Sequence, residues 1–222
     1  MSKKQKKEII DTMKVITLGE CGTGKTSIIR RYVHNIFDEN NLSTIGVNFS
    51  FKEIKLKDGN TISLKLIDTA GQEKYRSLAK SYFNNADAVL FVFSINSCNS
   101  FDNIKNWINL FIQNFSSEGY VAKYLVGNKS DLERKVSNDM INQFKEEYKD
   151  VKYYETSAKE NGGIEELFQE LAEDLYKILV KEGGERRNKS QNKLKISKYY
   201  KKKSNKGNCF CSSSSEFTKS KD

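Results

Sequence analysis

The sequence predicts a three-layer α/β domain in which helices cover both faces of a mostly parallel, six-stranded sheet with one antiparallel edge strand. Short apolar runs alternate with amphipathic stretches through the first 180 residues, a pattern typical of parallel strands joined by helices. Asp58-Gly59-Asn60 stands between two alternating runs and indicates a hairpin, so one strand is antiparallel. A glycine-rich segment directly after the first apolar run indicates a ligand site at the carboxyl edge of the sheet.

Strands are expected where apolar residues run together or alternate with polar ones. In chain order these runs are residues 14–19, 47–57, 61–68, 88–94, 121–127 and 151–155. The longest apolar stretch of the domain, residues 88–93, is far shorter than the ~20 residues that a membrane-spanning helix requires.

Helices are expected where apolar residues recur at helical spacing. The first follows the glycine-rich segment at residues 27–32, and the others fall near residues 75–83, 100–115, 137–149 and 163–180. Gly183-Gly184 closes the last of them, and no periodicity follows.

Charge and periodicity divide the 222-residue chain into a short basic N-terminal extension (1–12), an α/β domain (13–182) and a basic tail (183–222) that we expect to be disordered. Residues 181–222 hold thirteen Lys or Arg and four Asp or Glu, which accounts for the whole formal charge of +9. This favours attraction to an anionic membrane surface; a tail that is merely kept soluble is the alternative. The neutral remainder argues against a nucleic-acid partner. We expect a cytosolic monomer without a secretory signal.

The glycine-rich segment matches the phosphate-loop pattern G-x-x-x-x-G-K-[ST], and Ser27 follows it into the helix. Its residues are Gly19, Glu20, Cys21, Gly22, Thr23, Gly24, Lys25 and Thr26. The glycines allow backbone N–H groups to surround a phosphate at the positive end of a helix. Lys25 can reach the β- and γ-phosphates, and the Thr26 hydroxyl can bind Mg²⁺. The segment therefore predicts a nucleoside triphosphate site.

A second polar segment, Asp68-Thr69-Ala70-Gly71-Gln72-Glu73, lies at the end of the third predicted strand. The Asp68 carboxylate can hold Mg²⁺ through water, and Gly71 offers an unhindered N–H to a γ-phosphate. Gln72 can orient an attacking water, so we expect it to be the catalytic residue.

Two further segments bear on the base. Asn128-Lys129-Ser130-Asp131 follows the fifth strand, and the Asp131 carboxylate can accept both the N1–H and the N2–H₂ of guanine. Adenine has no such pair of donors, so Asp131 favours GTP over ATP. Backbone N–H groups of Ser157, Ala158 and Lys159, after the last strand, could meet guanine O6.

Together with Ser43-Thr44-Ile45-Gly46, these segments stand in the order of the nucleotide motifs of the Ras superfamily, which residues 14–180 resemble. The resemblance implies a P-loop NTPase G domain that binds GTP or GDP with Mg²⁺ and hydrolyses GTP slowly without an activating protein. It implies that Thr44 binds Mg²⁺ and senses the γ-phosphate, and that Phe37 packs edge-on against guanine. Arg30 and Arg31 are expected to face solvent.

Within the superfamily the chain is most similar to Rab proteins. The expected effector surface comprises Ile45, Gly46, Val47, Asn48, Phe49, Ile67, Tyr75 and Tyr82. Asn48 stands where Rabs usually carry Asp or Glu, and Ile67 where most have a tryptophan that forms an aromatic triad with the residues matching Phe49 and Tyr82. Cys21 occupies a phosphate-loop position that varies among Rabs.

In the tail, Cys209-Phe210-Cys211 resembles the motif on which Rabs receive two geranylgeranyl groups, but eleven residues follow it. The implied partners are an exchange factor, an activating protein, a dissociation inhibitor or escort protein, and vesicle effectors at the cytoplasmic face of endomembranes. Two alternatives stay open: a GTP-binding module with negligible hydrolysis and no lipid anchor, and a metabolic phosphotransferase, against which Asp131 argues.

Overall fold

The computed structural model describes residues 9–39, 44, 46–69, 81–115 and 120–181. Its sheet has six strands in the order β2-β3-β1-β4-β5-β6. They are β1 (Ile9–Leu18), β2 (Val47–Lys55), β3 (Thr61–Thr69), β4 (Ala88–Ser94), β5 (Ala122–Asn128) and β6 (Val151–Thr156). Only the edge strand β2 is antiparallel to its neighbour, so the predicted sheet is confirmed.

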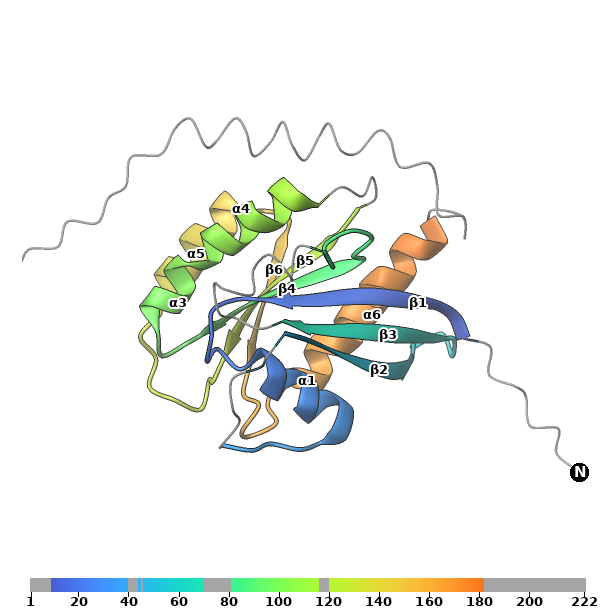
Figure 1. Cartoon of the computed structure of the whole chain (residues 1–222), viewed down its shortest axis with the longest axis horizontal. Coiled ribbons are helices and arrows are strands. Elements are labelled where there is room, and N and C mark those ends of the chain that lie inside the picture. Colours follow the sequence, from blue (N-terminus) through green and yellow to red (C-terminus); the bar gives the residue numbers. More distant parts are fainter. Residues whose placement is uncertain (1–8, 40–43, 45, 70–80, 116–119, 182–222) are drawn as a thin grey trace, which may run out of the picture.

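Five helices lie in the described part of the chain (Figure 1). They are α1 (Lys25–His34), α3 (Cys98–Asp102), α4 (Ile104–Asn114), α5 (Asn138–Glu147) and α6 (Ile164–Lys181).

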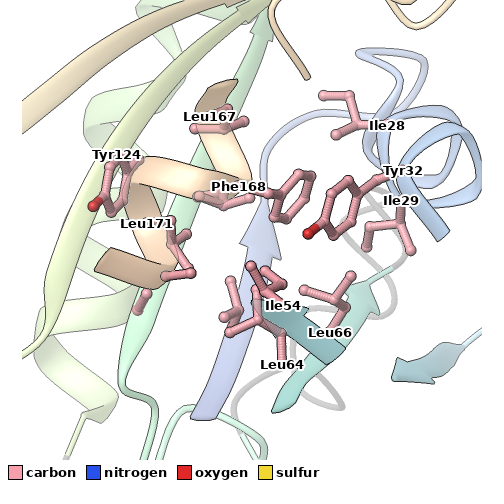
Figure 2. Close-up of a cluster of buried hydrophobic side chains, with 14 of the residues drawn as sticks. Ile28, Ile29, Tyr32, Ile54, Leu64, Leu66, Tyr124, Leu167, Phe168 and Leu171 are labelled. Carbon is pink, nitrogen blue, oxygen red and sulfur yellow. The ribbon is translucent and has the colours of Figure 1, made fainter. Parts of the chain in front are cut away.

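Helices cover both faces of the sheet, as predicted (Figure 1). α1 and α6 pack on one face, where Tyr32 stacks on Phe168 with ring centroids 3.9 Å apart (Figure 2). α3, α4 and α5 pack on the other face around Trp107, Phe111 and Phe144. Successive residues of the central strands point to opposite faces, so each strand supplies both cores. This explains why the strands are apolar throughout.

Three boundaries differ from the prediction. β1 begins at Ile9 instead of residue 14, so residues 9–12, assigned to the N-terminal extension, belong to the sheet. They pair with β3, with a shift in register between Ile9 and Thr12. The predicted helix 100–115 is two helices, α3 and α4, which meet at Asn103. Of the predicted helix 75–83, residues 75–80 lie outside the described part of the chain and residues 81–83 belong to a turn.

The described helices include none that is long and apolar enough to cross a membrane.

Candidate nucleotide-binding site

The loop between β1 and α1 turns tightly at two glycines. Gly24 precedes the helix with φ +93°, and Gly22 has φ +76°, both in the left-handed region that side chains disfavour. A Cβ on Gly24 would lie 2.2 Å from the side-chain nitrogen of Asn128, whereas one on Gly22 would meet nothing within 4 Å. The loop is therefore packed against β5 at Gly24 and open at Gly22. The N–H groups of the first turn of α1 start at this loop, which suits an anion.

Lys25 lies under the loop with its charge buried. Its side chain is only 5% exposed, and its Nζ donates to the carbonyl oxygens of Gly19 (2.9 Å) and Glu20 (2.8 Å). Burial lowers the pKa of Lys25 to about 8, although the nearby Asp68 charge opposes the shift. An anion bound in the loop would offset the cost of burying this charge. The ammonium is therefore held where a phosphate would neutralise it.

Thr26, Thr44 and Asp68 form one cluster beside Lys25. The Thr26 hydroxyl donates to Asp68 Oδ2 at 2.7 Å, and the Thr26 and Thr44 hydroxyl oxygens are 2.6 Å apart. Burial raises the pKa of Asp68. The other oxygen of this carboxylate, Oδ1, is buried and has no hydrogen-bond partner among the described residues. Two hydroxyl oxygens next to a carboxylate oxygen that lacks a hydrogen-bond partner fit Mg²⁺, which prefers oxygen ligands.

A pocket of about 210 Å³ lies next to the loop. Pockets for drug-sized ligands typically have ~300–1,000 Å³, so this one suits a single base. The predicted residues that line it are Gly24, Ser27, Phe37, Asn128, Lys129, Asp131, Ala158 and Lys159. Glu39 and Leu132 also line it, and nothing in the sequence motifs singled them out.

Asn128 ties the walls of this pocket together. Its buried side chain donates to Thr23 O at 2.9 Å and accepts from the Thr156 hydroxyl at 3.1 Å and from Ala158 N–H at 3.4 Å. The phosphate loop, β5 and the loop after β6 are thus linked through one amide. Both of its polar atoms are committed to protein partners, which makes it a positioning residue.

Asp131 is exposed at the pocket, and its Oδ1 accepts from the Ser157 hydroxyl at 2.5 Å. The Ser157 hydroxyl oxygen in turn accepts from the Glu160 N–H at 3.0 Å. The carboxylate is therefore oriented from the loop after β6, with acceptor capacity left for a ligand. Ser157 itself is buried, so its role here is to orient Asp131.

Arg31 was expected to face solvent, and that expectation is wrong. Its guanidinium donates to the carbonyl oxygens of Ala158 (2.9 Å) and Lys159 (3.1 Å) and lies 5.9 Å from the centre of the Phe37 ring. Helical periodicity places Arg31 on a partly polar side of α1, but contacts with residues about 127 positions away leave no local signal.

Glu20 and Cys21 are neighbours in the phosphate loop, but one side chain contacts α4 and the other is exposed. Glu20 Oε1 accepts from the indole N–H of Trp107 in α4 at 3.0 Å, a link that motif reasoning missed. The thiol of Cys21 is exposed.

Part of the predicted effector surface is formed by Phe49 and Tyr82, whose rings meet edge-on with centroids 5.4 Å apart. Phe49 is 45% exposed, Asn48 beside it is exposed, and Gly46 and Val47 are half-buried. Ile67 is fully buried in the core below α4, so its assignment to this surface is wrong. An aliphatic side chain gains more from that core than from exposure.

The remaining predicted residues lie outside the described part of the chain. They are Ile45, Gly71, Gln72, Tyr75, Cys209 and Cys211.

A phosphate-type loop between strand and helix, a cluster suited to Mg²⁺ and a base-sized pocket at one edge of a doubly covered sheet define a P-loop nucleotide-binding domain. Residues 14–177 match the Ras family model. The chain is 38% identical over 165 residues to "Ras-related protein RabC" of Dictyostelium discoideum, covering 73% of this chain and 83% of that relative.

Two other relatives agree. "Ras-related protein Rab-13" of Rattus norvegicus is 36% identical over 175 residues, covering 78% of this chain and 83% of that protein. "Ras-related protein Rab-11B" of Dictyostelium discoideum is 41% identical over 170 residues, covering 76% of each. The chain therefore belongs to the Ras family of small GTPases, in its Rab branch.

Proposed function

We propose that this protein is a GTP/GDP-regulated switch of the Rab type that hydrolyses GTP slowly and acts in vesicle-mediated transport. The observation that carries the nucleotide assignment is the pocket that Asp131, oriented by Ser157, lines together with Phe37 and with Gly24 of the phosphate loop. A carboxylate with free acceptor capacity matches the paired donors of guanine.

Within this proposal, the phosphate loop with Lys25 binds the β- and γ-phosphates. Thr26, Thr44 and Asp68 hold Mg²⁺, which when bound neutralises charge on the phosphates. Phe37 covers the guanine, and the loop of Ser157, Ala158 and Lys159 faces its O6. Gln72 orients the attacking water, and Gly71 senses the γ-phosphate together with Thr44.

Base specificity is tested by Asp131→Asn. An amide donates where the carboxylate accepted, so GTP affinity should fall by a factor of about 100 or more while the affinity for xanthosine triphosphate rises. Equilibrium binding of both nucleotides measures this, with Asp102→Asn, at an exposed position of α3, as the matched control. An unchanged preference for GTP in Asp131→Asn overturns the assignment.

Hydrolysis is proposed to depend on Gln72 and on an activating protein, which can accelerate it by roughly 10⁵-fold when it supplies an arginine. Single-turnover hydrolysis of bound GTP should slow at least about tenfold in Gln72→Leu. A rate that this change leaves untouched supports instead the second candidate, a GTP-binding module with negligible hydrolysis, which the unusual Cys21, Asn48 and Ile67 favour.

The membrane part of the proposal rests on the relatives and on the basic tail with Cys209 and Cys211. Two prenyl groups anchor a protein stably where one is marginal, and the lysines add attraction to anionic lipid. A dissociation inhibitor or escort protein, an exchange factor and effectors complete the proposed cycle. Intact mass of the protein from its own cells, beside a Cys209→Ser/Cys211→Ser variant, shows whether two geranylgeranyl groups are present; an unmodified chain overturns the lipid anchor alone.

A further inference from the structure

Arg31 touches both walls of the base pocket. One wall is the loop after β6, whose Ala158 and Lys159 carbonyls accept from Nε and from a terminal nitrogen of the guanidinium at 2.9 and 3.1 Å. The other is Phe37, whose ring centre lies 5.9 Å from the guanidinium carbon. A planar guanidinium with five donors can serve several acceptors at once, which an ammonium group does less well.

The same side chain also fastens the end of its own helix. The second terminal nitrogen of Arg31 donates to the backbone oxygen and to Oδ1 of Asn35, each at 3.1 Å. Asn35 ends α1 in a left-handed conformation, φ 56°, and its N–H returns to Arg31 O at 2.9 Å. Asn35 thus sets the direction in which the chain leaves the helix, and Phe37 follows two residues later.

We propose that Arg31 is a positioning residue that clamps the two walls of the base pocket and thereby sets how slowly guanine nucleotide dissociates. This rests on the proposed function. In a trans peptide the carbonyl and the N–H point in opposite directions. Because Arg31 holds the Ala158 carbonyl toward α1, the N–H of Lys159 in the same peptide points away from α1. The clamp therefore presents this N–H on the side opposite the arginine while it keeps Phe37 next to the loop.

A second link between the same segments is weaker. Lys159 Nζ and Glu39 Oε1 form an ion pair at 2.8 Å, but their side chains are 50% and 67% exposed. Exposed pairs contribute little and are screened by salt. Arg31 donates to four acceptors from a half-buried position, so the clamp depends on Arg31 more than on this ion pair.

The test measures release of a fluorescent GDP from Mg²⁺-loaded, full-length protein. Wild type is measured first, because a wild type that does not retain GDP overturns the proposed function itself. If it does, Arg31→Ala should release GDP about ten times faster or more, since a wall that is no longer preorganised holds its ligand less well. Arg31→Lys should lie between the two, because it restores the charge without the planar fork.

Two readouts separate positioning from general damage. Single-turnover hydrolysis of bound GTP should stay within about twofold of wild type, since Arg31 contacts the base side of the site only. Amide hydrogen exchange in the GDP complex should increase at residues 36–39 and 157–160 and stay unchanged at residues 19–26.

Arg30→Ala is the matched control, because it removes the same type of side chain from the same helix; its GDP release should stay within about twofold of wild type. If Arg31→Ala does not fold, Arg31→Lys takes its place and should release GDP faster than wild type and faster than Arg30→Ala. GDP release from the folded Arg31 variant at the wild-type rate, or at the rate of Arg30→Ala, overturns the clamp and leaves guanine nucleotide binding intact.

Discussion

The indole N–H of Trp107 donates a hydrogen bond to the Glu20 carboxylate at 3.0 Å, joining α4 to the phosphate loop across 87 residues of sequence. Trp107 is the only tryptophan of the chain and is 1% exposed. It is packed among the apolar side chains of α3, α4 and α5. The position of the loop is therefore linked to the packing of the core on that face of the sheet.

Trp107→Phe should lower the free energy of unfolding by roughly 2–3 kcal/mol, because it removes a donor to a charged group and leaves a gap in the core. Urea denaturation of the nucleotide-free protein measures this. Glu20→Gln keeps an acceptor for the indole N–H, and its loss should be smaller. Equal destabilisation of the two variants would contradict the expectation that Glu20→Gln keeps most of this hydrogen bond.

The strands could be predicted because their signal is local. The strands β3, β4 and β5 are buried on both faces, so each reads as a run of apolar residues whatever lies around it. The phosphate loop was equally visible, since a glycine such as Gly24 and the lysine after it are needed at fixed spacing. The break between α3 and α4 was not visible, because the apolar periodicity continues through Asn103.

The links that position the site could not be predicted in this way. Arg31 reaches the loop after β6, and Glu20 reaches α4; both contacts depend on how distant segments are brought together. The assignment of Ile67 to the surface came from the family resemblance, although the apolar residues on both faces of β3 indicate burial. Motifs identify the groups that meet a ligand, while the residues that hold those groups emerge from the fold.

The buried ammonium of Lys25 predicts an unusual pH dependence. Burial lowers its pKa from 10.5 to about 8, so between these values the unfolded chain binds more protons than the folded one. The cost of burying the charge is present below pH 8 and is lost as pH rises. The nucleotide-free protein should therefore gain roughly 1–2 kcal/mol of stability from this group between pH 8 and 9.5.

Urea denaturation of wild type and Lys25→Met over this range isolates the effect, because tyrosines with raised pKa, such as Tyr32, contribute equally to both proteins. Lys25→Met should lack the increase. Saturating GDP should suppress it in wild type, because the phosphates favour the charged lysine. Parallel pH profiles of the two nucleotide-free proteins would show that Lys25 is not the group responsible.

The substitution Asp68→Asn should have opposite effects on stability in the absence and in the presence of Mg²⁺. Burial raises the pKa of its carboxyl, so the ionised form opposes folding at neutral pH, where the neutral isostere of Asp68→Asn does not. Without metal, the variant should be at least as stable as wild type. With GDP and Mg²⁺ the order should reverse, because the amide is a much poorer ligand for a hard cation.

Thermal unfolding with GDP in a Mg²⁺ titration measures this, and Asp102→Asn is the control for the loss of one carboxylate at an exposed position. Wild type and Asp102→Asn should be stabilised alike by Mg²⁺, and Asp68→Asn by less than half as much in melting temperature. An equal response of all three proteins means that Mg²⁺ is held without Asp68.

Gly24 and Gly22 provide a matched pair in the phosphate loop. Both have positive φ, so alanine at either position costs about 1–2 kcal/mol in backbone strain. Only at Gly24 does the new Cβ collide with a neighbour, since it would lie 2.2 Å from the Asn128 nitrogen that donates to Thr23 O. Gly24→Ala should therefore be less stable than Gly22→Ala by at least about 2 kcal/mol in the nucleotide-free protein, because a buried hydrogen bond is lost as well.

A double-mutant cycle assigns this difference to Asn128. Asn128→Ala alone removes the hydrogen bonds to Thr23 and from Thr156, so it should be destabilising by about 2 kcal/mol or more. In Gly24→Ala/Asn128→Ala the collision is absent and the bond is already lost. The double variant should then be more stable than the two single changes added together, by about 1 kcal/mol or more. Additive losses would place the cost of Gly24→Ala in the backbone of the loop and not at Asn128.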